Sequence, residues 1–156
     1  MPSKKPLPLS GIHILVVDDN EDIRNLMQMA LEHYGAFVVL AGSARQGLAE
    51  LQKVIPDVIL ADLAMPDEDG FWFIREVRKL TPEGGGMIPT IAFTAYGNEH
   101  EHLALAAGFN ACLLKPVHLD EVCAVIQKLA SEKADGNTST PGSTPGLASA
   151  RSSGCG

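Results

Sequence analysis

Short apolar runs alternate with longer amphipathic segments along most of this chain. The runs are rich in branched residues and nearly free of charge, as in buried strands; they cover 12–17, 36–41, 57–61, 87–93 and 111–114. The segments between them repeat apolar residues at the spacing of one helical face; they cover 20–35, 43–54, 69–80, 98–108 and 118–132. The pattern predicts five strands that alternate with five helices.

The strand segments are continuous apolar runs rather than alternating ones. Such runs are expected when helices cover both faces of a parallel sheet, so the predicted fold class is α/β. Asn20 and Ser43 are suited to cap the first two helices, and Gly35 is suited to end the first. Ligands of such folds bind outside the carboxyl ends of the strands, which directs attention to the residues there.

The composition indicates the domain organisation of the chain and the cellular environment in which it functions. The 156 residues suit one domain, predicted at 11–132 between a flexible N-terminus at 1–10 and a disordered Gly/Ser/Thr/Pro-rich tail or linker at 133–156. The net charge of -7, with scattered lysines and arginines, argues against direct nucleic-acid binding. Three widely spaced cysteines and no apolar stretch of membrane-spanning length favour a cytoplasmic protein without direct membrane contact.

Side chains that can bind a metal ion or take part in a reaction lie where the predicted strands end. Asp18 and Asp19 follow the first strand, Asp62 the third, Thr94 the fourth and Lys115 the fifth. If these strands are neighbours, three carboxylates converge, and their repulsion is relieved by a hard cation such as Mg²⁺. A carboxylate beside a metal ion and a lysine can attack phosphorus and form an aspartyl phosphate, so we expect Asp62 to be a nucleophile.

Each of these residues also has an ordinary structural explanation. An Asp pair or a single Asp commonly caps a helix or a turn, a threonine often ends a strand, and a lysine before proline often lies at a surface turn. The ordered appearance of all of them at successive strand ends favours the functional interpretation.

Four motifs carry a family resemblance: LVVDDNEDIR (15–24), DLAMPDEDG (62–70), FTAYG (93–97) and AAGFNACLLKPV (106–117). Through them, residues 10–131 resemble the receiver domain of two-component response regulators. The resemblance implies a flavodoxin-like, doubly wound parallel sheet of order 2-1-3-4-5. It also implies phosphotransfer from a histidine kinase or a histidine phosphotransfer protein, and a signalling domain rather than an enzyme.

The resemblance assigns a role to each site residue. Asp62 matches the phosphoacceptor, Thr94 the switch hydroxyl and Lys115 the phosphoryl contact. Asp18, Asp19, Asp62 and the backbone carbonyl of Ala64 match the Mg²⁺ ligands.

The resemblance also implies a cis peptide bond before Pro116. A phosphorylated family member signals by moving its fourth helix, fifth strand and fifth helix, where a downstream protein binds. We expect a monomer or weak dimer, and either a single-domain regulator or the receiver of a hybrid histidine kinase.

The chain departs from the family pattern at position 112. Cys112 stands where an aromatic residue normally couples to the switch hydroxyl, so we expect altered coupling between Thr94 and the output face.

Ala64 and Tyr96 offer no acid or amide to orient water, so we expect slow loss of the phosphoryl group; a half-life of seconds would contradict this. Trp72 and Phe73 are adjacent on a helix, so one of them should be partly exposed.

Two other functions compete with this interpretation. A haloacid-dehalogenase-type phosphatase also uses a strand-end Asp and Mg²⁺, but it needs a second Asp where this chain has Ala64. A receiver-like module that is never phosphorylated usually lacks one of the site residues, and all are present here. Incubation with acetyl phosphate and magnesium distinguishes a phosphoacceptor domain from this silent module, and turnover of a phosphate ester would favour the phosphatase.

Overall fold

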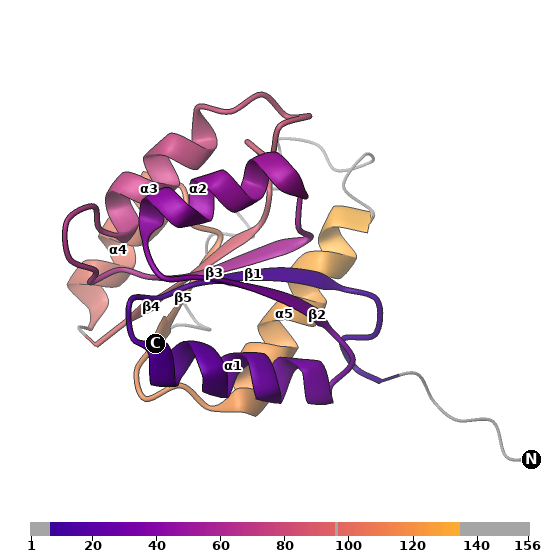
Figure 1. The fold of residues 1–156 in the computed structure, drawn as a ribbon. Helices are drawn as coiled ribbons and strands as arrows, with labels where there is room; N and C mark the ends of the chain where they lie inside the picture. The colour runs from indigo at the N-terminus through magenta and orange to yellow at the C-terminus, as the bar shows by residue number, and fades with distance from the viewer. Residues whose placement is uncertain (1–6, 96, 135–156) are drawn as a thin grey trace, which may run out of the picture.

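The computed structural model, which describes residues 7–95 and 97–134, places a parallel five-stranded sheet between two layers of helices (Figure 1). The strand order is β2-β1-β3-β4-β5, and every neighbouring pair is parallel. The strands are β1 (His13–Val17), β2 (Phe37–Ala41), β3 (Val58–Asp62), β4 (Thr90–Thr94) and β5 (Ala111–Leu114). The predicted α/β class and the order 2-1-3-4-5 are confirmed.

Five helices cover the two faces of the sheet. They are α1 (Glu21–His33), α2 (Ala44–Lys53), α3 (Gly70–Arg78), α4 (Asn98–Ala107) and α5 (Leu119–Ala134). Helices α2, α3 and α4 lie on one face of the sheet, and α1 and α5 lie on the other (Figure 1). One apolar cluster joins the sheet to α2, α3 and α4, and a second joins the opposite face to α1 and α5. β3 and β4 are buried along their whole length because helices cover both of their faces.

Local signals fix where the first two helices begin. The side chain of Asn20 accepts a hydrogen bond from the Ile23 N–H, and that of Ser43 accepts one from the Gln46 N–H. These contacts satisfy backbone donors of the first turn that have no partner within the helix. Gly35 follows α1 with φ of 99°, a conformation that glycine adopts without steric cost.

The fourth strand begins three residues later than the sequence pattern predicts. We expected it from Met87, but β4 starts at Thr90, and Met87 is 74% exposed. Pro89 has no N–H to donate to a ladder, although its carbonyl accepts a hydrogen bond from the Ile59 N–H. The third strand, expected to stop at Ala61, includes Asp62 as its last residue.

The predicted flexible start at 1–10 is wrong for residues 7–10, whereas residues 1–6 lie outside the described part. Leu9 is fully buried in the cluster between α1 and α5, and its N–H donates to the carbonyl of Tyr34 at 2.8 Å. The Gln127 side chain donates to the Pro8 carbonyl. Burial of one large apolar side chain outweighs the entropy cost of ordering this short turn.

The last helix extends slightly beyond the predicted 118–132 and reaches Ala134. The rest of the predicted tail, 135–156, lies outside the described residues. Because α5 runs antiparallel to the strands, its end lies at the edge of the sheet where the strands begin (Figure 1). Among the helices of residues 7–95 and 97–134, none is long and apolar enough to cross a membrane.

Arg78, the last residue of α3, holds the amino edge of the sheet together. Its guanidinium donates to the carbonyls of Gly86, Ile88 and Gly108 and to the Asn110 side chain, at 2.7–3.1 Å. Burial lowers the pKa of this side chain. Arg78 therefore connects three segments that the sequence pattern alone does not bring together.

Candidate phosphoacceptor site

Four neighbouring strands deliver the expected residues to one edge of the sheet. Asp18 directly follows β1, Asp62 ends β3, Thr94 ends β4 and Lys115 directly follows β5. The register pairs Asp62 with Phe93 and Thr94 with Leu114, so these strands end level with one another. The parallel arrangement thus brings together residues that are up to 97 positions apart in the chain.

Three carboxylates meet at this edge. One oxygen from each of Asp18, Asp19 and Asp62 lies within 4.8 Å of the others. Asp18 and Asp62 are buried, whereas Asp19 is exposed. The cluster therefore has two buried carboxylates and one side open to solvent, through which a small ion can enter.

Lys115 places its ammonium beside the two buried carboxylates. Its Nζ lies 3.3 Å from Oδ1 of Asp62 and 4.0 Å from Oδ2 of Asp18. The Lys115 N–H donates to the carbonyl of Thr94 at 2.7 Å, and the Lys115–Pro116 peptide bond is cis. The backbone at the end of β5 thus directs this lysine toward Asp62.

The environment of Asp18 fits a divalent cation. Burial raises the pKa of its carboxyl group, and the negative charges of Asp62 and Asp19 raise it further, against a lowering by the Asn20 N–H and Lys115. Its Oδ2 is buried and accepts no hydrogen bond within the described part of the chain. A hard cation with oxygen ligands would supply the missing partner and offset the repulsion among the carboxylates.

Arg24 also fixes the backbone of Asp18. The guanidinium of Arg24 donates to the Asp18 backbone carbonyl at 2.7 Å, and the Asp18 N–H donates to the carbonyl of Ala41. The sequence pattern alone assigns no role to Arg24. Asp18 lies outside α1 and six residues before Arg24, so no helical spacing in the sequence indicates this contact.

The loop after β3 packs tightly against Asp62. The Ala64 N–H donates to Oδ1 of Asp62 at 3.3 Å, and the side chain of Asp69 caps α3 by accepting from the Trp72 N–H. A Cβ on Gly70 would lie 2.6 Å from the Asp62 carbonyl oxygen, closer than real Cβ contacts. Glycine at position 70 therefore lets the start of α3 approach the end of β3.

Thr94 and Cys112 lie on the face of the sheet that α3 and α4 cover. Both are 1% exposed, and Cys112 packs in the same apolar cluster as Ala104 of α4. Position 112 is thus a buried inward-facing position occupied by a small side chain. Phe73 is fully buried and Trp72 is half-buried beneath the guanidinium of Arg45, so the expected difference between these two aromatics is confirmed.

A hollow of about 420 Å³ opens beside the site, between the loop after β3 and α4. Ala64, Asp69, Phe71 and His100 contribute to its lining. His100 is half-buried, with its ring edge-on to Phe71 at 6.3 Å between centroids. The sequence did not reveal this contact because it depends on how α3 and α4 pack.

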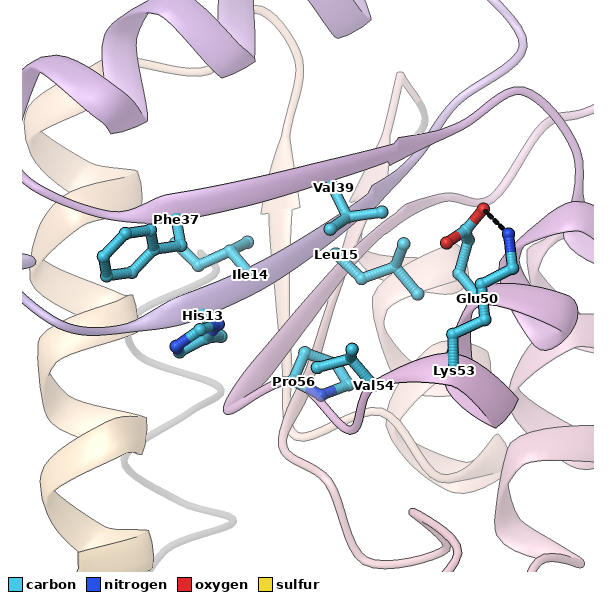
Figure 2. Close-up of a pocket in the computed structure, with 9 residues that line it drawn as sticks. All are labelled: His13, Ile14, Leu15, Phe37, Val39, Glu50, Lys53, Val54 and Pro56. Carbon is cyan, nitrogen blue, oxygen red and sulfur yellow. Dashed lines mark hydrogen bonds and ion pairs between the residues drawn. The ribbon is translucent and has the colours of Figure 1, made fainter.

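A second pocket, of about 130 Å³, lies at the opposite edge of the sheet (Figure 2). Phe37, Val39 and Val54 give it an apolar lining, and Lys53 and Glu50 form an ion pair at 3.3 Å beside it. Its lining has no group of converging carboxylates, so the chemistry described above belongs to the other edge.

Comparison with known proteins agrees with this geometry. The family model described as the response regulator receiver domain matches residues 14–127. A 14.6 kDa protein encoded in the sodA1 3′ region of Leptolyngbya boryana is 41% identical over 77% of this chain and 91% of that protein. The transcriptional regulatory protein TrcR of Mycobacterium tuberculosis is 34% identical over 77% of this chain, which spans only 46% of TrcR.

Solved structures share the same fold. The receiver domain of the sensor histidine kinase PA1611 from Pseudomonas aeruginosa has a TM-score of 0.71 at 30% identity, covers 78% of this chain and 99% of its own, and holds magnesium in its active site cleft. The chemotaxis protein CheY4 of Vibrio cholerae has a TM-score of 0.70 at 29% identity, over 76% of this chain and 98% of its own.

Proposed function

Because the chain belongs to the family of response regulator receiver domains of two-component signalling, we propose that Asp62 is its phosphoacceptor. The observation that carries this assignment is the ion pair of 3.3 Å between Lys115 and Asp62, inside a group of three converging carboxylates. An ammonium in that position can hold the oxygens of an incoming phosphoryl group, whose negative charge it stabilises.

The transfer that we propose moves a phosphoryl group from a phosphohistidine to Asp62. A lone pair on an Asp62 carboxylate oxygen forms the new O–P bond, while the N–P bond of a phosphohistidine breaks and its electrons stay on the imidazole nitrogen. The donor is a histidine kinase or a histidine phosphotransfer protein. Lys115 remains in contact with the transferred group and offsets part of its charge.

We further propose that Asp18, Asp19, Asp62 and the backbone carbonyl of Ala64 hold a magnesium ion. When bound, this ion would neutralise charge on the carboxylates and on the phosphoryl oxygens. The buried Oδ2 of Asp18, which accepts no hydrogen bond within the described residues, supports this ligand set. Arg24 and Asn20 hold Asp18 in place through its carbonyl and its other carboxylate oxygen.

Thr94 is the proposed switch. Its hydroxyl, at the end of the strand next to β3, would turn toward the phosphoryl group on Asp62, and the resulting shift of α4 and β5 would alter the surface of α4, β5 and α5 that a downstream protein binds. Ala64 is exposed and has no polar side chain, so we also propose slow hydrolysis of the acyl phosphate.

Acetyl phosphate with magnesium tests the assignment directly. We expect the intact mass of the wild type to rise by one phosphoryl group, and no such rise for Asp62→Asn or in the presence of a chelator. Asp67→Asn is the matched control, since Asp67 is an exposed carboxylate of the same loop and Asn tolerates its φ of 62°. Phosphorylation of the Asp62→Asn variant, or none of the wild type, would contradict the proposal.

A further inference from the structure

Helix α4 carries a buried carboxylate that the proposed transfer does not use. Glu101 is 5% exposed, whereas its neighbours Glu99 and His102 are exposed. Within the described residues, the other buried carboxylates are Asp18 and Asp62, which belong to the site. A glutamate in the first turns of a helix normally extends into water, so the burial of Glu101 needs an explanation.

The position of Glu101 follows from its helix. It lies three residues before Ala104 and therefore on the same face of α4. Ala104 is fully buried in the cluster that contains Ala92 of β4 and Cys112 of β5. Since the chain enters α4 soon after Thr94, Glu101 lies nearer than Ala104 to the carboxyl ends of β4 and β5, and thus to the proposed switch.

The carboxylate of Glu101 is poorly compensated in this position. Its Oε2 is buried and accepts no hydrogen bond from any described residue. A buried carboxylate oxygen without a donor raises the free energy of the conformation that buries it, because water solvates the same group well. A conformation in which α4 moves away from the sheet would hydrate Glu101 and remove this cost.

We propose that Glu101 is a positioning residue that biases α4 toward its displaced, signalling conformation. The inference rests on the proposed function, because the displacement is the one that phosphorylation of Asp62 would favour. Position 112 holds the small Cys112 instead of a bulky aromatic ring that could move with Thr94, and in this proposal the buried glutamate of α4 contributes to the coupling in its place. Glu101 then sets how readily the domain responds to a phosphoryl group, without touching that group.

Beryllofluoride, a non-covalent mimic of the phosphoryl group, provides the test. Its apparent affinity falls when the responsive conformation is less populated, even if its own contacts are unchanged. Glu101→Leu removes the buried charge, so we expect apparent affinity to fall by about fivefold or more. The apparent affinity of Glu101→Gln should fall less. That of Glu101→Asp, which keeps the charge, should remain near the wild-type value. Glu99→Gln is the exposed control on the same helix.

Hydrogen exchange of the α4 backbone distinguishes an effect on the response of α4 to the mimic from a simple change in packing. We expect Glu101→Leu to protect α4 in the resting state and to reduce the loss of protection that the mimic causes. Unchanged affinity and unchanged exchange in Glu101→Leu and Glu101→Gln would overturn the inference, as would an equal loss in Glu101→Asp. If the wild type itself binds no mimic and takes up no phosphoryl group, the proposed function fails instead. Should Glu101→Leu not fold, Glu101→Gln carries the same comparison.

Discussion

Removal of the Lys115 ammonium should destabilise the metal-free protein by an amount that the structure allows us to estimate. At an effective dielectric constant of about 20, its attraction is about 5 kcal/mol to Asp62 at 3.3 Å and about 4 kcal/mol to Asp18 at 4.0 Å. Much of this is offset by desolvation, and a lysine side chain that is 26% exposed is partly screened. We therefore expect Lys115→Met to lower the free energy of unfolding by about 3 kcal/mol, the lower end for a broken buried pair.

Urea denaturation with a chelator, followed by circular dichroism, measures this loss. Magnesium should reduce the deficit, since it offsets the same carboxylates that lose their cation; a ligand at about 100 times its Kd stabilises a fold by about 2.7 kcal/mol. Lys79→Met is the control, because Lys79 pairs with Glu76 at 2.8 Å but is 71% exposed, so its change should stay within about 0.5 kcal/mol. Equal effects of the two variants, or a deficit that magnesium does not change, would refute the electrostatic account.

Three further predictions concern the site and its support. Burial raises the pKa of Asp18 in the folded protein above its ordinary value, so this group favours the fold at low pH and loses that contribution as pH rises through the folded pKa. Asp18→Asn should therefore raise the urea midpoint at pH 7 in chelator, and should lose the extra stability that magnesium gives the wild type. Gly70→Ala should cost about 2 kcal/mol of stability, because its Cβ meets backbone atoms of Asp62 and Leu63, and phosphoryl uptake should slow; unaltered uptake would count against this reasoning. Arg78→Met should cost about 3 kcal/mol in thermal or urea unfolding by leaving several carbonyls without donors, whereas the extent of phosphorylation per folded molecule should not change.

The sequence was sufficient to predict the parallel sheet and the edge at which its chemistry gathers. Continuous apolar runs indicate strands that are buried on both faces, and the carboxyl ends of parallel strands necessarily lie at one edge. The residues directly after or at the ends of those runs, Asp18, Asp62, Thr94 and Lys115, therefore had to be neighbours once the strand order was known. The family resemblance supplied that order.

Features that depend on packing between distant elements were not predictable in this way. Leu9 is buried only because α1 and α5 leave a place for it, and nothing in residues 1–10 reveals that place. Glu101 has the sequence pattern of an exposed first-turn acid, yet α4 turns it toward the sheet. The multiple hydrogen bonds of Arg78 link the end of α3 to the carbonyls of Gly86, Ile88 and Gly108, whose proximity only the folded chain establishes.

The placement of the two described ends has a practical consequence for measurement. The turn at Pro8 rests against Gln127, and α5 finishes at Ala134 beside the edge where the strands begin, opposite Asp62. A fluorophore, biotin or surface tether attached at the turn around Pro8 would therefore lie at the edge of the sheet opposite the acidic cluster. Association of a phosphodonor with an immobilised copy can therefore be timed without the anchor obstructing its approach.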